Sequence, residues 1–347
     1  MSKIYTDKDV TSTAKMAYFN FDSKYINQYL DSKQIYPTVK ELLNYLINNE
    51  KTDYTRENIY EIYTSFEYNG SDGNNAVKDF IDSLLGEDSN GNAVELAECA
   101  NWRIVGVKDE NNDNGFYGVA FETSDDSVIL GFRGSEAGNG QGYNDWIAAN
   151  LSISTGTSTT QERKAADFLT EFLDNDKYNH VSTSGHSLGG NLAFDSAILS
   201  ALNSNIYKLE EAVSLDGPGH PDSFYEYYSR EVNIVKDRLF HYRWSLVGEI
   251  YNQPTDYDKW LNYDLVMTSA GKLQNPIEKH SIMNLKFNGS NFNELYSNVH
   301  NYSSPKYANT LGMIKTLEKS VGFGTKHKVI ATILPDRAER YFSTALI

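Results

Sequence analysis

The feature that most constrains the fold of this chain is a serine between two glycines, at the junction of a predicted strand and a predicted helix. Residues 180–184 form the predicted strand, and residues 188–202 form a predicted helix rich in small and apolar residues. Gly185 and Gly189 lie two residues before and two residues after Ser187. Glycines at these places leave room for the strained backbone of a tight turn. The pattern predicts a nucleophile elbow that exposes the Ser187 hydroxyl beside the helix N-terminus.

The elements on both sides of this turn predict a mostly parallel sheet. From about residue 161 onward, helix-like and strand-like stretches alternate, and this alternation requires crossover connections between parallel strands. Further strands in this part of the chain are expected at residues 211–215, 238–242 and 265–268. Upstream, three short β-rich runs separated by turns predict a meander at residues 102–107, 116–121 and 128–132.

The predicted elements divide the chain into a core and two flanking regions. Residues 101–290 are expected to form an α/β-hydrolase fold with a mostly parallel central sheet. Residues 1–100 read as helical, because apolar residues recur at helical spacing over residues 42–47 and 59–66. We expect them to be an N-terminal extension or cap that packs on the sheet. Residues 291–347 are expected to form a C-terminal helical segment packed on the core.

The net charge restricts the partners that this chain can have. The formal net charge is −16 at pH 7. Binding to the phosphate backbone of a nucleic acid requires a basic surface, so we expect no nucleic-acid partner. The same charge opposes binding to strongly anionic membranes. A neutral or locally presented lipid is compatible with it.

Cysteine content and hydropathy bear on the compartment. Cys99 is the single cysteine, which excludes an internal disulfide, and we expect it to be a small buried hydrophobe. Residues 1–10 are polar and lack the apolar stretch of a secretory signal. No run of apolar residues is long enough to span a membrane. We therefore expect a cytoplasmic protein, or one exported without a cleaved signal peptide, with no transmembrane segment.

One acidic stretch superficially resembles a calcium-binding loop. In residues 109–115 the glycine comes one place late, and Ala120 stands where the bidentate acid would lie. A hairpin turn between two strands is the better interpretation. We expect neither a metal nor an organic cofactor.

A second motif follows the predicted strand at residues 128–132. The strand ends in Arg133, Gly134 and Ser135. An oxyanion hole requires the N–H of the residue after the nucleophile and a second donor from a neighbouring strand end. Leu188 is expected to supply the first donor, and Ser135 is placed to supply a backbone N–H and a hydroxyl.

Taken together and in this order, the motifs resemble the class 3 (fungal-type) lipase family. The matching segments are Phe-Arg-Gly-Ser at 132–135, Asn-Asp-Trp at 144–146, Asn-Leu at 150–151 and Gly-His-Ser-Leu-Gly-Gly at 185–190. The resemblance covers about residues 101–290. It implies that Ser135 and Leu188 form the oxyanion hole and that residues 144–151 lie in or beside a mobile lid. Residues 138–142 would then be the hinge of the lid, with an ordinary surface loop as the alternative.

Serine chemistry also requires a histidine base and an acid that orients it. In α/β hydrolases the acid and then the histidine follow the serine along the chain, which leaves His220, His241, His280, His300 and His327. We prefer His280, because it lies in a polar stretch expected at the carboxyl edge of the sheet, where catalytic groups collect. His300 is the main alternative. His241 is expected to be a core histidine, and His220 to cap the next helix.

The acid is where this sequence departs from the family. Class 3 lipases carry their aspartate near the end of the strand two after the elbow, and Ser245 occupies that place here. Asp216 lies instead at the end of the strand directly after the elbow helix, as in pancreatic-type lipases. Adjacent strand ends are close enough for this carboxylate to reach the same histidine. We therefore predict Asp216 as the acid, with a simple Asx turn as the alternative role and Asp256 and Asp258 as reserves.

Three functions are compatible with this pattern. The first is serine-dependent hydrolysis of carboxylic esters by a lipase or phospholipase, through an acyl-enzyme on Ser187, with transient contact to a lipid interface. The second is an esterase, thioesterase or acyltransferase that acts on soluble substrates. The third is a decayed hydrolase retained as a binding module, which the serine at position 245 suggests. The sequence identifies no protein partner for the N-terminal helices.

Overall fold

The computed structural model describes residues 4–64, 73–110, 115–134, 159–245, 247–249, 251, 253–261, 280–285 and 287–293. Several predictions fall outside these residues. They concern Ser135, the hinge at residues 138–142, the strand at 265–268, His300, and the C-terminal helical segment beyond residue 293.

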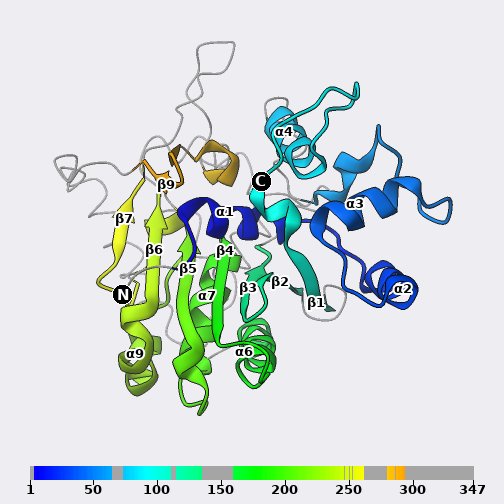
Figure 1. Ribbon diagram of the computed structural model, residues 1–347. Coiled ribbons are helices and arrows are strands. Elements are labelled where there is room, and N and C mark those ends of the chain that lie inside the picture. The colour runs from blue at the N-terminus through cyan, green and yellow to red at the C-terminus, as the bar shows by residue number, and fades with distance from the viewer. Residues whose placement is uncertain are drawn as a thin grey trace, which may run out of the picture.

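A seven-stranded sheet forms the centre of the molecule (Figure 1). Its strands follow chain order: β1 Arg103–Glu110, β2 Phe116–Ser124, β3 Ser127–Phe132, β4 His180–His186, β5 Leu209–Leu215, β6 Leu239–Arg243 and β7 Asp258–Trp260. The first three strands pair antiparallel, as the predicted meander requires. From β3 to β7 every pair is parallel. A separate hairpin pairs β8 (Phe287–Asn288) with β9 (Asn291–Phe292).

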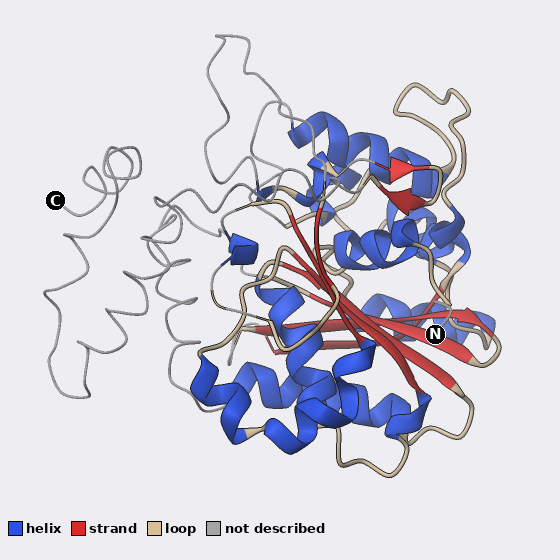
Figure 2. Ribbon diagram, turned by 90° about the vertical axis from the view of Figure 1, so that its left-hand side faces the viewer, coloured by secondary structure: helices blue, strands red, loops and turns tan. Residues whose placement is uncertain are grey.

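Helices cover both faces of the sheet (Figure 2). They are α1 Asp7–Met16, α2 Ser23–Lys33, α3 Val39–Asn48, α4 Gly73–Leu85, α6 Thr160–Leu173, α7 Leu188–Leu199, α8 Asp222–Tyr227 and α9 Ser229–Val235. Successive strand residues point to opposite faces. Val128 and Leu130 therefore belong to the core under α6 and α7, while Ile129 belongs to the core under the N-terminal helices. Burial on both faces of the sheet explains why β3 is apolar after its first residue, Ser127.

The N-terminal helices pack directly on the sheet. Helix α1 lies across β3, β4 and β5, and the Ser184 hydroxyl on β4 donates to the carbonyl oxygen of Val10 at 2.8 Å. The Arg133 guanidinium, just after β3, donates to the carbonyl oxygens of Ala17 at 2.8 Å and Phe19 at 2.7 Å. These buried bonds join the first helix to the two strands that carry the sequence motifs.

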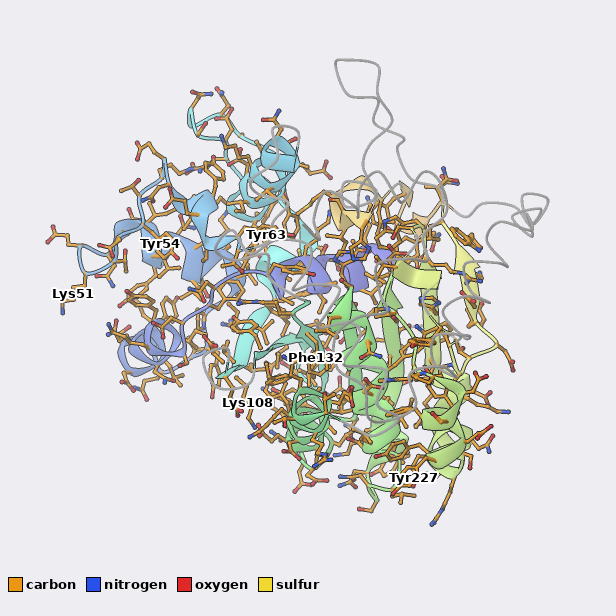
Figure 3. The ribbon with its side chains drawn as sticks, turned by 180° about the vertical axis from the view of Figure 1, so that it is seen from behind. Lys51, Tyr54, Tyr63, Lys108, Phe132 and Tyr227 are labelled. Atoms are coloured by element: carbon orange, nitrogen blue, oxygen red, sulfur yellow. The ribbon has the colours of Figure 1, made fainter. Side chains whose placement is uncertain are left out.

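One predicted helix is wrong. The apolar spacing at residues 59–66 predicted an α-helix, but the structure has a short 3₁₀ turn, η1 (Ile59–Ile62), followed by a bridge between Tyr63 and Phe19. The apolar residues of this stretch are buried: Ile59, Ile62 and Tyr63. The spacing therefore indicates which residues are buried, and not that they form a continuous helix. Figure 3 places Tyr63 within the body of the molecule and Tyr227, which is 74% exposed, at its edge.

The mostly parallel seven-stranded sheet, with α7 following β4 through the turn at Ser187, has the α/β-hydrolase fold, as predicted. None of the helices in the described ranges is long and apolar enough to cross a bilayer. Cys99 is buried, as expected of a small core side chain.

Candidate active site

Ser187 occupies a strained turn between β4 and α7. Its φ of 60° and ψ of −132° are rare for a residue with a side chain and cost about 1–3 kcal/mol. Its N–H donates to the carbonyl oxygen of Leu215 at 3.0 Å. A Cβ on Gly185 would fall on the carbonyl oxygen of Gly189, and a Cβ on Gly189 would fall on that of Phe132. The two glycines of the motif are therefore required by the close approach of backbone to backbone.

The end of β3 lies beside this turn. A Cβ on Gly134 would collide with the Tyr18 hydroxyl and would lie 2.7 Å from the carbonyl oxygen of His186. Arg133 is buried, with its guanidinium carbon 3.6 Å from the centre of the Tyr117 ring. The segment that leads to Ser135 is thus held against the elbow. Leu188, the first residue of α7, places its N–H at the same end of the sheet.

Asp216 and His280 form a buried pair at the carboxyl edge of the sheet. Asp216 follows β5 with a φ of 50°, and its N–H donates to the carbonyl oxygen of Tyr242 at 2.6 Å. Its Oδ2 lies 2.6 Å from Nδ1 of His280. The two residues are 0% and 1% exposed. Asp258, a reserve acid, instead pairs with His241 and with Arg243 at 2.8 Å, and Asp256 is exposed.

Ser245 binds the carboxylate of Asp216, the acid predicted in place of the aspartate of class 3 lipases. Its hydroxyl donates to Oδ2 of Asp216, and its N–H donates to Oδ1 at 3.0 Å. The N–H of Trp244 donates to the same Oδ1 at 3.0 Å. The Ser245 hydroxyl is also 3.2 Å from Nδ1 of His280. Ser245, at the position where class 3 lipases have their acid, therefore fixes an acid that comes from the neighbouring strand.

These contacts keep Asp216 ionised. Burial alone would raise the pKa of Asp216, but the hydrogen bond and charge of His280, with the bonds from Ser245 and Trp244, outweigh it and lower the pKa below its usual range. A buried carboxylate with a low pKa accepts a hydrogen bond from the Nδ1–H group and fixes the orientation of the imidazole. The other ring nitrogen, Nε2, is then the basic one.

His186, which comes directly before Ser187, contacts His280. Its Nε2 lies 2.8 Å from the carbonyl oxygen of His280, and its Nδ1 lies 3.1 Å from the Tyr18 hydroxyl. The ring is stacked on Trp244 at an interplanar angle of 8°. Burial, followed by the charge of His280, lowers the pKa of His186 to about 3. A neutral ring that donates from Nε2 satisfies both contacts, so His186 is a positioning residue.

The remaining described histidines have other partners. His241 lies inside β6, with Nδ1 3.0 Å from Asp258 and Nε2 3.2 Å from the carbonyl oxygen of Gly217, so it is the core histidine that we expected. The prediction that His220 caps the next helix is wrong. Pro221 is the N-cap of α8, and the His220 ring turns inward to Asp195, because that carboxylate is buried nearby.

The arrangement brings together the parts needed for acyl transfer at one edge of the sheet. Ser187, which is buried, and the N–H of Leu188 follow β4, and Asp216 follows β5. The ring of His280 lies 4.5 Å, centroid to centroid, from that of His186 at the end of β4. Sequence reasoning missed His186 and the role of Ser245. The signal for Ser245 was its place in the family's acid position, and the position of His186 inside the elbow motif gave no signal of its own.

Known proteins that are similar to this chain include one sequence family and two lipases of solved structure. The sequence model of the family described as Mbeg1-like matches residues 94–322. A crystal structure of M37 lipase is similar, with 12% identity over 70% of this chain and 68% of that chain, and a TM-score of 0.35. A triacylglycerol lipase from Penicillium expansum has 15% identity over 62% of this chain and 87% of that chain, and a TM-score of 0.30. No curated protein matches this chain.

Proposed function

The chain belongs to the Mbeg1-like family, and we propose that it is a serine-dependent carboxylic-ester hydrolase with Ser187 as nucleophile. The observation that carries this proposal is the buried pair of Asp216 and His280, 2.6 Å apart, beside the elbow. A buried aspartate that fixes an imidazole is what a serine nucleophile needs from its neighbours. A serine that had only a structural role in a tight turn would not require such a pair.

In the proposed mechanism, His280 Nε2 takes the proton of the Ser187 hydroxyl as Oγ attacks the ester carbonyl. Asp216 remains ionised and stabilises the imidazolium that forms. The N–H of Leu188 and the backbone or hydroxyl of Ser135 stabilise the developing oxyanion. Collapse of the intermediate expels the alcohol, which receives the proton from His280. Water then attacks the acyl-enzyme, with His280 again as base, and releases the acid.

We propose an acyl ester of a lipid as the substrate. The combination of the Phe-Arg-Gly-Ser segment at 132–135 with the elbow, on which the resemblance to class 3 lipases rests, supports a lipase or phospholipase. With a net charge of −16, transient contact is expected with a neutral or zwitterionic interface rather than an anionic one. Emulsified substrate should be hydrolysed faster than the same ester in solution, and equal rates would favour an esterase for soluble substrates.

The acid at position 216 also argues against a decayed hydrolase. A serine at position 245 would leave His280 without a carboxylate if no other acid were near. Asp216 supplies one, and Ser245 donates a hydrogen bond to it. A binding module that had lost its chemistry would not need to keep this buried charge, which is costly unless it is paired.

Hydrolysis of a medium-chain nitrophenyl ester tests the proposal. Ser187→Ala is expected to lower kcat by about 10⁴-fold or more, because the nucleophile is lost. Ser182→Ala is the matched control, since Ser182 lies on the same strand and its buried hydroxyl has no partner among the described residues. It should retain the wild-type kcat. Wild-type activity in Ser187→Ala would overturn the proposal.

A further inference from the structure

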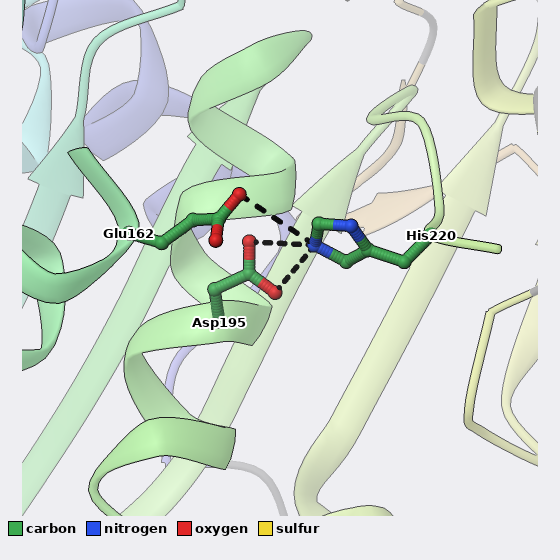
Figure 4. A group of neighbouring side chains, drawn as sticks. All are labelled: Glu162, Asp195 and His220. Carbon is green, nitrogen blue, oxygen red and sulfur yellow. Dashed lines mark hydrogen bonds and ion pairs between the residues drawn. The ribbon is translucent and has the colours of Figure 1, made fainter. Parts of the chain in front are cut away.

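A second group of ionisable side chains gathers at α7, the helix that follows Ser187 (Figure 4). Glu162 comes from the first turn of α6, Asp195 from the middle of α7, and His220 from the loop after β5. Nε2 of His220 lies 2.9 and 3.0 Å from the two carboxylate oxygens of Asp195 and 4.0 Å from Oε1 of Glu162. Each of the three residues is at most 1% exposed. The mechanism above uses none of them.

Asn191 adds a fourth polar side chain to this group. The amide nitrogen of Asn191 lies 3.0 Å from the same Nε2 of His220. A protonated Nε2 can donate to Asp195 but cannot accept from Asn191, and a bare Nε2 can do only the reverse. Oδ1 of Asn191 is buried and has no hydrogen-bond partner among the described residues. Exchanging the two amide atoms, which are assigned from their bonding, turns this oxygen toward Nε2.

The buried position of the carboxylates points to the same kind of site. Glu162 and Asp195 are both buried beside His220, whose Nε2 lies 2.9 Å from Asp195 and 4.0 Å from Glu162. Two carboxylates this close repel each other when ionised unless a positive charge lies beside them. A divalent cation with two carboxylates and a neutral imidazole is electrically neutral, which removes the cost of burying unpaired charge.

We propose that Glu162, Asp195, His220 and Asn191 bind one divalent transition-metal cation of the zinc class. Imidazole nitrogen and carboxylate oxygens are common zinc ligands, and the Asn191 amide oxygen would bring the number of protein ligands to four. Ligand atoms about 2.0–2.2 Å from a tetrahedral zinc are about 3.3–3.6 Å apart. The separations of 2.9 and 4.0 Å bracket that value, and all three residues offer atoms within 4.8 Å of one another.

The surroundings hold the ligands in place. Oε2 of Glu162 accepts the N–H of Thr159 at 2.6 Å as part of a capping box, which leaves Oε1 directed at His220. The His220 ring is stacked on Phe224 with centroids 3.8 Å apart, and its backbone N–H donates to the Tyr225 hydroxyl at 2.9 Å. Such outer contacts orient metal ligands and raise the affinity of a site.

The cation is structural in this account. Asn191 and Asp195 lie one turn apart on the helix that begins after Ser187, and His220 follows Asp216 by four residues. One ion would join α6, the elbow helix and the loop after the acid. It would therefore fix the distance between the strand ends that carry Ser187 and Asp216, whether or not the protein hydrolyses esters.

Zinc titration of the full-length protein tests the site. Protein stripped with EDTA and then freed of chelator should bind one equivalent of Zn²⁺ in calorimetry, with a rise in Tm. Glu162→Gln and His220→Gln should weaken Zn²⁺ binding by more than the roughly 10- to 100-fold that outer-contact changes cause. His180→Gln is the matched control, because His180 also contacts two carboxylates, Glu210 at 2.7 Å and Asp126 at 4.0 Å, but its side chain is 40% exposed. It should bind zinc like the wild type.

Three results would overturn the site: a wild type that binds no zinc, undiminished binding in both Glu162→Gln and His220→Gln, or loss of binding in His180→Gln. Circular dichroism shows whether each variant folds. If the variants do not fold, the visible spectrum of the wild type with Co²⁺ decides. Intense bands of a four-coordinate ion support the site, and the spectrum of hydrated Co²⁺ contradicts it.

Discussion

At the residue scale, two neighbouring strand ends supply one acid function. The carboxylate comes from Asp216 after β5, and three of its hydrogen bonds come from Trp244 and Ser245 after β6. The left-handed backbone of Asp216, with φ of 50°, turns its side chain toward His280. The end of β5 therefore supplies the carboxylate, and the segment after β6 supplies hydrogen bonds that stabilise its charge. Each contribution can be tested with a variant of its own.

Replacing the charge should stop catalysis while leaving the fold intact. In Asp216→Asn, Oδ1 still accepts the N–H groups of Trp244 and Ser245, but an amide nitrogen faces Nδ1 of His280. The imidazole then takes the wrong tautomer, and kcat should fall by about 10⁴-fold. Steady-state ester hydrolysis measures this. Asp258→Asn is the matched control, because Asp258 pairs with His241 and Arg243, and an equal loss in both variants would contradict the assignment.

Removing the Ser245 hydroxyl should have a smaller effect on the same step. A hydrogen bond to a charged group is worth about 1.5–3 kcal/mol, so Ser245→Ala should lower kcat by roughly 10- to 100-fold. KM should stay the same, because the hydroxyl orients the acid rather than the substrate. Ser245→Thr restores a hydroxyl and should recover most of kcat. A rise in KM at unchanged kcat would show that Ser245 does not act through Asp216.

Sequence patterns predicted part of this site. Ser187 follows from the spacing of two glycines, and Asp216 and His280 follow from their expected places at the carboxyl edge of the sheet. The contacts of Ser245 with Asp216, and of His186 with Tyr18, join residues 29 and 168 positions apart. Such contacts depend on tertiary packing, so no local pattern predicts them.

At the element scale, the elbow depends on how closely β3 approaches α7. Gly189→Ala would place a Cβ on the carbonyl oxygen of Phe132. Separating the two elements should cost about 3 kcal/mol of unfolding free energy, at the upper end of overpacking costs. It should also lower kcat, since the N–H of Leu188 moves with the helix. Urea denaturation measures the first effect.

Gly91→Ala provides the control for this variant. Unlike Gly189, Gly91 has a positive φ, of 80°, and nothing lies within 4 Å of its added Cβ. The change should cost only the roughly 1–2 kcal/mol of the left-handed backbone and should leave kcat unchanged. Equal destabilisation by the two variants would mean that close approach is not the reason for a glycine at position 189.

The elements differ in how well the sequence predicts them. The prediction of an α/β-hydrolase fold with a mostly parallel sheet is confirmed, because apolar runs separated by turns identify buried strands such as β3. The same rule failed at residues 59–66, where burial against Phe19 selects a 3₁₀ turn and a bridge. Short β7, with partly exposed residues, has no apolar run and escaped prediction.

At the scale of the whole molecule, the N-terminal region is joined to the core by buried polar bonds. Val10, Ala17 and Phe19 accept hydrogen bonds from Ser184 and Arg133, and Tyr18 reaches His186. The sequence suggested that these helices pack on the sheet. It did not indicate that Tyr18, just after the first of these helices, would contact His186.

The burial of His186 gives the stability of the protein a pH dependence. Burial lowers the pKa of His186 from 6.5 to about 3. Between these values the unfolded chain binds a proton that the folded chain excludes. The unfolding free energy should therefore fall, by up to about 1.4 kcal/mol per pH unit, as the pH decreases through this window. Above pH 6.5 the contribution of His186 is constant.

His186→Gln isolates this effect from the other titrating groups. The variant lacks the proton uptake, so the stability advantage of the wild type over it should shrink between pH 7 and pH 4. Urea unfolding of both proteins at matched pH values measures the difference. An advantage that stays constant over this range would mean that His186 is not held neutral in the folded protein.

The most direct test of the central claim is the reaction of the native protein with a fluorophosphonate. Oγ of an activated serine attacks phosphorus, fluoride leaves, and a stable adduct remains. Mass spectrometry should find one adduct on Ser187, formed far more slowly in His280→Ala and absent in Ser187→Ala. A wild type that gives no adduct, or one that is labelled at the same rate without Ser187 or His280, would contradict the account.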